Sequence, residues 1–260
     1  MQILGKEKQE QIVSTIRTAG TMISDAKLEQ SQIYDKEGAA NFVTKYDKQI
    51  QSYLIDAFSK ILPEAHYLAE EDGIQDQVEK GYCFIIDPID GTTNFIYDYH
   101  HSCISVGLAL DGEMLFGVVY NPYVDEMYIA QKGQGAFLNG RQIHCSYDGL
   151  DRNMIAFGCA RYNTDDTDRI FAIAKELYLN SMAIRNGGSS TLDICRCASG
   201  ANGIYIELKL YPWDYAAASL ILTEAGGVIT QLDGSPVSLQ EASGVLAGGA
   251  KCWEEALSMI

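Results

Sequence analysis

The feature of this sequence that most limits its fold is a series of strand patterns and tight turns that runs from Tyr82 to Gly140. Two apolar runs, Ser102–Leu110 and Met114–Tyr120, flank the dipeptide Asp111-Gly112, which is typical of a turn between antiparallel strands. Because short turns of this kind join neighbouring strands, the stretch predicts a mostly antiparallel sheet.

Two amphipathic helices are predicted before this sheet. Apolar side chains recur at helical spacing within residues 8–28, and again from Thr44 to a position just before Pro63. Residues 31–43 lack this periodicity and predict a loop, whereas residues 66–69 predict a short strand. The first half of the chain is therefore expected to combine helices with a sheet.

The second half of the chain alternates between strand and helix patterns. Strands are predicted at about 153–158, 182–185, 203–207 and 244–247, and helices at about 166–178, 190–199 and 214–225. This alternation is typical of an α/β arrangement. We therefore predict one domain over residues 1–260, with an antiparallel-sheet half at about 1–150, an α/β half at about 151–260, and a site between them.

The net charge of −16 limits the partners of the protein. Nucleic acids and anionic membranes are bound largely through Lys and Arg, so we expect neither of them as a partner. A phosphate ester would also be repelled by a carboxylate-rich site unless bound cations reversed the local charge. If the substrate is a phosphate, the sequence therefore implies metal ions.

The cysteine pattern favours a reducing compartment. There are seven Cys, an odd number without a CxxC pair, and no set of His and Cys has the spacing of a zinc site. The first residues lack the apolar core of a signal peptide, and no uncharged apolar run approaches the length of a membrane span. We therefore expect reduced, buried thiols in a soluble, cytoplasmic protein.

The stretch DPIDGTTNF at residues 87–95 has the clearest chemical signal. It follows an apolar strand pattern, and we expect the strand to stop at Pro88, which has no N–H to donate. On a tight turn, the carboxylates of Asp87 and Asp90 can converge on one point with the carbonyl of Ile89. An oxygen-only set of this kind suits Mg²⁺.

The next residues of this stretch are suited to phosphate. Gly91 lets the backbone come close to a ligand, and a helical turn that begins at Thr92 would direct free N–H groups to the same place. An ordinary Asp-Pro turn followed by a helix cap explains the same residues, and both interpretations remain open.

Three other acidic positions are candidates for the site. Glu70-Glu71-Asp72 ends a predicted strand, and adjacent acids repel one another unless a cation neutralises them. Asp214 begins a predicted helix, where it could cap the helix or bind a metal. Asp47 follows Thr44 in the pattern of a capping box, although it could instead orient a hydroxyl or a water. The residues alone leave these alternatives open.

In their joint order, these motifs resemble the inositol monophosphatase family of lithium-sensitive, magnesium-dependent phosphatases. The pieces that carry the resemblance are IIDPIDGTTNF (85–95), WDYAAASLILTEAGG (213–227), GVVYNP (117–122), GQGAFLNG (133–140) and IRNGGSSTLDICRCASG (184–200). The resemblance extends from Lys36 to about Gly249. It implies a five-layer αβαβα sandwich of the inositol monophosphatase / fructose-1,6-bisphosphatase type, which agrees with the predicted α+β and α/β halves.

The resemblance implies two to three Mg²⁺ ions and a ligand set for each. Glu70, Asp87 and the carbonyl of Ile89 would hold the first ion. Asp87, Asp90 and Asp214 would hold the second, and a weaker third ion would lie near Glu70. Glu70 would thus be both a metal ligand and a catalytic residue.

The resemblance also implies roles in catalysis and in substrate binding. The Thr92 hydroxyl, paired with Asp47, would position and deprotonate the attacking water, while the N–H groups of Gly91 and Thr92 bind the phosphate. Lys36 would lie on a mobile loop that helps to close the site. The residues that would meet the substrate's hydroxyls are Asp90, Gly188, Ser189, Ser190 and Glu207.

The expected substrate is a small-molecule phosphate monoester, foremost myo-inositol 1-phosphate, which a metal-activated water would attack in line at phosphorus. Fructose-1,6-bisphosphate, histidinol phosphate and adenosine 3′,5′-bisphosphate are alternatives within the same fold. Glu207 and the TTNF ending of the central motif favour the inositol type. The resemblance further implies inhibition by Li⁺ and a homodimer.

Two alternatives come from other classes of protein. A non-catalytic, metal-binding regulatory protein should have lost at least one ligand, yet every expected acid is present. A dinucleotide-binding protein is suggested only by Gly133-Gln134-Gly135, and Leu138 stands where the GxGxxG pattern needs its last glycine. We therefore favour an enzyme over both.

His100 and His101 lie in a segment that departs from the usual family pattern, because the Pro that often follows this turn is missing. Either imidazole could contact the substrate. Packing on the surface or in the core is the simpler explanation, since the spacing of the two His is not typical of ligands.

Overall fold

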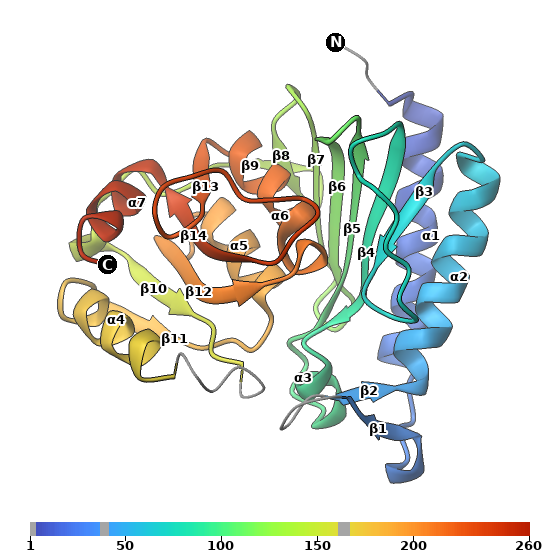
Figure 1. Cartoon of the computed structure of the whole chain (residues 1–260), viewed down its shortest axis with the longest axis horizontal. Coiled ribbons are helices and arrows are strands. Elements are labelled where there is room, and N and C mark those ends of the chain that lie inside the picture. The colour runs from blue at the N-terminus through green and yellow to red at the C-terminus, as the bar shows by residue number, and fades with distance from the viewer. Residues whose placement is uncertain (1–3, 37–41, 161–166) are drawn as a thin grey trace.

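Two sheets and three layers of helices alternate across the molecule (Figure 1). The coordinates are those of a computed structural model, which describes residues 4–36, 42–160 and 167–260. From one outer face to the other, the helices come as the pairs α1 (Lys6–Ser24) and α2 (Lys45–Ile61), α6 (Pro212–Glu224) and α5 (Ser190–Ala198), and α4 (Thr167–Leu179) and α7 (Ala250–Leu257). The described chain is therefore the αβαβα sandwich that the resemblance implies.

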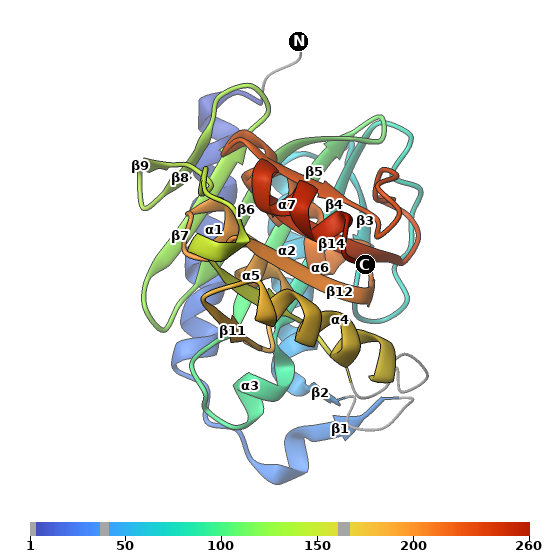
Figure 2. The ribbon, with the colours of Figure 1, turned by 90° about the vertical axis from the view of Figure 1, so that its left-hand side faces the viewer.

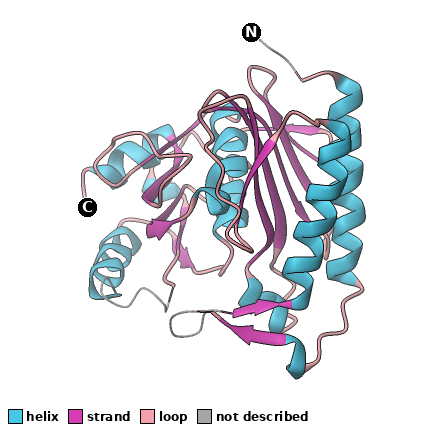
Figure 3. Cartoon of the chain, turned by 45° about the vertical axis from the view of Figure 1, so that its right-hand side comes forward, coloured by secondary structure: helices cyan, strands magenta, loops and turns pink. Residues whose placement is uncertain are grey.

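The larger sheet has seven strands. In spatial order they are β3 (His66–Ala69), β4 (Tyr82–Asp90), β5 (Cys103–Leu110), β6 (Glu113–Asn121), β7 (Glu126–Gln131), β8 (Ala136–Leu138) and β9 (Arg141–Ile143). Only β3 and β4 pair in parallel, and the other neighbours are antiparallel, as the hairpin signals predict. Figure 3 shows α1 and α2 side by side on the outer face of this sheet.

The smaller sheet has five strands and is mixed. In spatial order they are β11 (Ala183–Arg185), β10 (Met154–Phe157), β12 (Ile204–Leu210), β14 (Ser243–Gly249) and β13 (Gly227–Thr230). β10 runs parallel to both of its neighbours, whereas β14 runs antiparallel to both of its own. All four strands and all three helices predicted for this half are confirmed, although position 166 of the predicted helix lies outside the described residues.

Several short strands and one short helix were not predicted from the sequence. β13 and α7 were not predicted, because four residues that begin with Gly and a helix of eight residues give little periodicity. The predicted loop over residues 31–43 is wrong at both ends. There, β1 (Ile33–Asp35) and β2 (Phe42–Thr44) form an antiparallel pair, while residues 37–41 lie outside the described residues. Strands of three residues are too short to show alternation.

The expectation that β4 stops at Pro88 is wrong, since the strand continues to Asp90. Asp87 lies opposite Ser105 of β5, and Asp90 lies opposite Cys103, so β4 has one residue more than its partner over this interval. This is a β-bulge, and because it interrupts the ladder, the missing N–H of Pro88 costs no hydrogen bond. The bulge brings both carboxylates to the same end of the strand.

Helix α6 sets the spacing between the two sheets. Its residues are buried on nearly all sides, which is typical of a helix inside a core. A side chain at Gly117 of β6 would lie 2.7 Å from the Ala217 carbonyl oxygen, so only glycine allows this approach. Pro212 is the first residue of α6, where its fixed φ and missing N–H are favourable, and it sets the start of the helix just before Asp214.

The predicted chemistry of the cysteines agrees with the structure. All seven Cys are free, and six of them are buried. Burial raises the pKa of the Cys103 and Cys195 thiols well above the ordinary value, which disfavours the reactive thiolate. Within the described ranges, no helix has both the length and the apolar composition needed to cross a membrane.

Candidate active site

A cavity of about 410 Å³ collects most of the residues that were predicted for the site. It lies where β4 ends and where α5, α6 and the short helix α3 (Thr92–Ile96) begin. Figures 1 and 2 both show α3 and the β1–β2 pair at this end of the molecule. The predicted residues that line the cavity are Glu70, Asp87, Ile89, Asp90, Gly91, Thr92, Gly188, Ser189, Ser190, Glu207 and Asp214.

Three carboxylates from distant parts of the chain meet in this cavity. One oxygen each from Asp87, Asp90 and Asp214 lies within 4.8 Å of the other two. The β4 bulge supplies the first two side chains, and the first turn of α6 supplies the third. Glu70 lines the same cavity but stands outside this compact group, which the structure therefore builds from three acids.

The two roles that the sequence left open for Asp214 are compatible. Its Oδ2 accepts a hydrogen bond from the Tyr211 N–H at 2.7 Å, which caps α6. A carboxylate has two oxygens and several lone pairs, so capping leaves capacity for another partner. Asp214 therefore both caps the helix and takes part in the acidic cluster.

The electrostatics of the cluster are suited to a cation. Burial, followed by the charges of neighbouring acids, raises the pKa of Asp87 and of Asp214 well above the ordinary value. Burial also raises the pKa of Asp90 to about 6. The described lining of the cavity contains five carboxylates and no Lys or Arg. A bound divalent cation would relieve this repulsion, and oxygen ligands suit hard ions such as Mg²⁺.

Asp90 is held by the first turn of α5. Its Oδ2 accepts from the Ser189 hydroxyl and from the Thr191 N–H, the latter at 2.9 Å. Ser190 lies farther away, with 3.5 Å between its hydroxyl and Asp90 Oδ1. A backbone donor leaves no compositional signal, so no role was predicted for Thr191, whose hydroxyl also donates to the Asp214 carbonyl.

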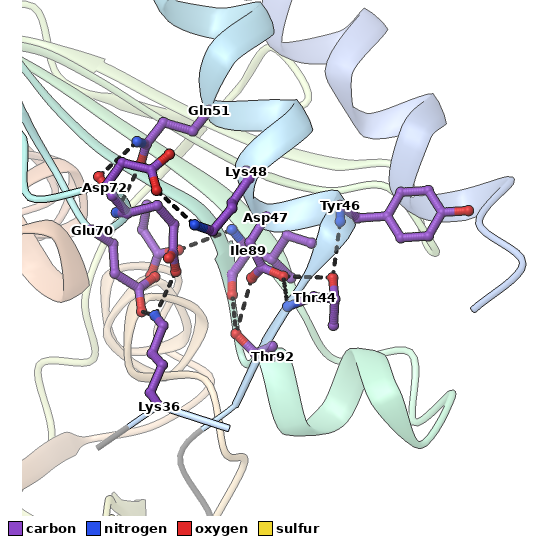
Figure 4. A network of polar contacts seen from close by, with 12 residues as sticks. Lys36, Thr44, Tyr46, Asp47, Lys48, Gln51, Glu70, Asp72, Ile89 and Thr92 are labelled. Carbon is purple, nitrogen blue, oxygen red and sulfur yellow. Dashed lines mark hydrogen bonds and ion pairs between the residues drawn. The ribbon is translucent and has the colours of Figure 1, made fainter. Parts of the chain in front are cut away.

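Asp47 and Thr92, of which Thr92 lines the cavity, form a second polar group (Figure 4). The Thr92 hydroxyl lies 3.3 Å from Asp47 Oδ1 and 3.1 Å from the Ile89 carbonyl oxygen. Asp47 Oδ2 accepts from the N–H and the hydroxyl of Thr44, as the capping-box pattern predicts. Burial raises the pKa of Asp47 to about 7, so this carboxylate can accept a proton near neutral pH.

Lys36 reaches the acidic residues at the end of β3, as Figure 4 shows. Its ammonium forms ion pairs with Glu70 and Glu71, and the distance to Glu70 Oε1 is 2.8 Å. Glu71, which was not assigned a role from the sequence, is buried, and its backbone N–H and carbonyl bond the Gln51 side chain. The ammonium thus sits beside Glu70 and offsets part of the negative charge there.

The turn at Gly91 is pressed against the loop before α5. Gly91 has φ +87°, and a side chain there would lie 3.0 Å from the His101 carbonyl oxygen and 3.1 Å from that of Gly188. Asn94, which the sequence reasoning missed, donates to the carbonyls of His101 and Gly187 at 2.8 Å each. Gly91 and Asn94 therefore connect the loop before β5, which contains His101, to the loop before α5, which contains Gly187 and Gly188.

Neither His100 nor His101 is among the described residues that line the cavity. His100 is exposed, stacks on Tyr123 at 4.6 Å between ring centroids, and lies 2.8 Å from Asp98. The His101 Nε2 atom is buried, and burial lowers the pKa of this imidazole. Packing, which was the simpler explanation, therefore describes both side chains.

A five-layer sandwich with a carboxylate-lined cavity at the starts of α3, α5 and α6 is suited to a class of enzymes that work with metal ions. Comparison with known proteins identifies the group within that class. The sequence model of the inositol monophosphatase family matches residues 6–259, and the chain belongs to this family.

Individual relatives agree with this assignment. Inositol-1-monophosphatase of Synechocystis sp. is 34% identical over 241 residues, which cover 92% of this chain and 84% of that protein. The structure of extragenic suppressor protein suhB from Bartonella henselae superimposes with a TM-score of 0.89 at 27% identity, covering 96% of this chain and 97% of that chain. Inositol monophosphate-bound SaIMPase-II has a TM-score of 0.82 at 27% identity, covering 96% and 92%, and has also been solved with 2′AMP.

Proposed function

We propose that the protein hydrolyses a small-molecule phosphate monoester with the help of two to three Mg²⁺ ions, and that the foremost substrate is myo-inositol 1-phosphate. The observation that carries this proposal is the convergence of Asp87, Asp90 and Asp214 in one cavity that contains no basic side chain among its described residues. An anionic ester enters such a cavity only when cations accompany it.

The metal ligands that we propose are those present in the cavity. Asp87, Asp90 and Asp214 would hold one ion, and Glu70 with Asp87 and the Ile89 carbonyl would hold another. A weaker third ion is proposed near Glu70. When bound, Mg²⁺ lowers the pKa of water and offsets negative charge on the phosphate.

Asp47 and Thr92 are proposed to handle the proton of the attacking water. The Thr92 hydroxyl has one hydrogen, and it lies within reach of two acceptors, Asp47 and the Ile89 carbonyl. With that hydrogen donated to Asp47, the Thr92 oxygen is free to accept one from water. Asp47 then takes up the proton, which is consistent with a pKa of about 7.

The phosphate is proposed to rest on the start of α3. The first hydrogen bond that closes this helix runs from the Phe95 N–H to the Gly91 carbonyl, at 3.0 Å. The N–H groups of Gly91 and Thr92 precede that bond, and they are therefore available to phosphate oxygens in line with the attacking water. Little covalent chemistry is asked of the protein in such a transfer.

The alcohol part of the substrate is proposed to contact other residues of the cavity lining, which are Asp90, Gly188, Ser189, Ser190 and Glu207. SaIMPase-II has been solved with inositol monophosphate and with 2′AMP, so related sites accept alcohols of different shape. For this reason, fructose-1,6-bisphosphate, histidinol phosphate and adenosine 3′,5′-bisphosphate belong in the substrate test.

The remaining family properties are also proposals for this chain. They are inhibition by Li⁺, assembly as a homodimer, a single functional domain over residues 1–260, closure of the site by the segment at Lys36, and a cytoplasmic location. The free, buried thiols support a reducing compartment.

The test is a phosphate-release assay with the four esters, each in Mg²⁺ and in excess chelator. We expect inositol 1-phosphate to have the highest kcat/KM and chelator to abolish its hydrolysis. Full activity in chelator would overturn the metal assignment. Rapid hydrolysis of another ester, with none of inositol 1-phosphate, would overturn the substrate assignment.

A further inference from the structure

We propose that Tyr205 is a positioning residue, which holds the Glu207 carboxylate in the orientation that reads the hydroxyls of the substrate's alcohol, and that Gly158 lacks a side chain to make room for this pair. All three residues line the cavity and lie against one another. The inference rests on the proposed function for the role of Glu207 and for the choice of substrate.

The pair is built by the alternation of a strand. Tyr205 and Glu207 are two positions apart on β12, so their side chains leave the same face of the sheet. The Tyr205 hydroxyl donates a hydrogen bond to Glu207 Oε2. The exposed fractions are 1% for Tyr205 and 8% for Glu207, so the bond is shielded from bulk solvent. A phenol has one hydrogen, which this bond uses.

The surroundings of Glu207 make that donor important. The nearby charges that act on its carboxylate are Asp90 and Asp193, which are both negative. Burial raises the pKa of Glu207 to about 7, whereas hydrogen bonds from Tyr205 and from the Ala160 backbone lower it. Without the phenol, the buried carboxylate would lose one of two donors and would protonate or turn.

Gly158 completes the arrangement from the end of β10. A Cβ atom at this position would overlap both the Glu207 carboxylate and the Tyr205 hydroxyl. The φ of Gly158 lies outside the left-handed region, so steric overlap and not backbone strain requires glycine here. The Gly158 N–H donates to the Ile206 carbonyl at 2.9 Å, and this bond prevents the backbone from moving away.

A carboxylate fixed in this way favours one chemical class of ligand. Each oxygen can accept from a hydroxyl, so a rigid carboxylate can bind two hydroxyls of a polyol at once. An alcohol without further hydroxyl groups gains nothing from Glu207. The Tyr205–Glu207 pair therefore selects for polyol phosphates over simple phosphate esters.

The first test is Tyr205→Phe, assayed with inositol 1-phosphate and with 4-nitrophenyl phosphate. For the polyol ester, we expect KM to rise by about three- to tenfold, the equivalent of one hydrogen bond, with kcat little changed. For 4-nitrophenyl phosphate, kcat/KM should stay within about twofold, since no bond to a polyol is lost. An equal loss with both esters would show a general structural defect and would overturn the proposal.

A double-mutant cycle with Glu207→Gln gives the sharper result. If Tyr205 acts through Glu207, the double variant should have the same KM for inositol 1-phosphate as Glu207→Gln alone. Additive effects would overturn the positioning role even if Tyr205→Phe lowers the melting temperature. Gly158→Ala should raise the same KM and spare 4-nitrophenyl phosphate, and an unchanged KM would contradict the role given to Gly158.

Matched controls are available in the chain. Tyr128→Phe makes the same chemical change at a buried tyrosine of β7 that is not among the described residues of the cavity lining. Gly5→Ala adds a methyl group where no atom lies within 4 Å. Both variants should keep the wild-type KM.

The wild-type assay distinguishes failure of the proposed function from failure of the role of Tyr205. If wild type prefers another hydroxyl-bearing ester to inositol 1-phosphate, the substrate assignment fails, and the cycle is read with that ester against 4-nitrophenyl phosphate. If wild type hydrolyses no ester at all, both the proposed function and the role of Tyr205 are overturned.

Discussion

A carboxylate oxygen of Asp90 lies within 4.8 Å of one from Asp214, although the two residues belong to opposite halves of the chain and to different layers of the sandwich, the larger sheet and the central helices. The bulge at the end of β4 presents the first carboxylate, and the first turn of α6 presents the second. The proposed metal chemistry depends on this meeting.

Removing the charge of Asp90 should abolish activity without unfolding the protein. In Asp90→Asn, the amide keeps the size of the carboxylate but cannot supply the charge that holds a divalent cation. We expect kcat to fall by at least about 100-fold, more than is usual for a residue that only supports a metal ligand. Asp233→Asn, at an exposed carboxylate far along the chain, should be neutral. Activity within a few-fold of wild type in Asp90→Asn would contradict the ligand role.

The Thr92 hydroxyl should matter through its contact with Asp47, at 3.3 Å. Thr92→Val removes the hydroxyl and keeps the shape, so we expect kcat to fall by about 10²-fold or more, as for loss of an acid–base group. Thr92→Ser keeps the hydroxyl and should retain most of the activity. Equal kcat values for the Val and Ser variants would exclude a role for the hydroxyl in proton transfer.

The metal-free protein should lose stability as the pH rises. Burial raises the pKa of Asp90 to about 6 and that of Asp47 and Glu207 to about 7 in the folded state. In the unfolded chain these carboxyl groups lose their protons near pH 4. Between about pH 4 and pH 7, the folded state therefore binds more protons than the unfolded state. Stability therefore falls with rising pH across this window.

Thermal unfolding in chelator measures this effect. We expect the melting temperature to be lower at pH 8 than at pH 5.5 by at least about 5 °C. Mg²⁺ should raise it more at pH 8, because metal ligands must be deprotonated to bind. A metal-free melting temperature that rises with pH from 5.5 to 8 would show that these carboxyl groups are not buried as described.

An added methyl group at Gly117, where the larger sheet contacts α6, should lower the melting temperature. In Gly117→Ala, the new methyl group would lie 2.7 Å from the Ala217 carbonyl oxygen. Overpacking of this kind typically costs about 1–3 kcal/mol, or about 2–10 °C of melting temperature for a chain of this size. The comparison variant is Gly5→Ala, which meets no atom within 4 Å and, as the N-cap of α1, should lose only a capping preference and therefore less stability. Equal melting temperatures for the two variants would contradict the close approach.

Much of the fold could be predicted because its long elements have strong periodicity. The hairpin at Asp111-Gly112 and the helix that begins after Thr44 follow from local chemistry. The missed β1–β2 pair and β13 are strands of three or four residues, whose formation depends on neighbours that sequence patterns do not show. Pro88 misled the prediction because a bulge lets a strand pass through proline.

The acids of the candidate site could be predicted from the sequence, but the residues that support the site could not. The acids at 87, 90 and 214 were assigned because their motifs in joint order resemble the inositol monophosphatase family, whereas each residue alone also fitted a turn or a helix cap. No role was predicted for Thr191, which holds Asp90 through its backbone N–H, or for Asn94, whose side chain bonds the carbonyls of the bordering loops. Backbone partners of this kind leave no signal in the sequence. Ordinary polar residues on a helix give no sign of which tertiary neighbour they will meet.

The most direct test of the central claim is anomalous diffraction from crystals of the protein soaked with Mn²⁺ and inorganic phosphate. We predict a manganese peak bonded to oxygens of Asp87, Asp90 and Asp214, with the phosphate between that ion and the start of α3. A peak elsewhere, with these three carboxylates free of metal in an active enzyme, would contradict the account.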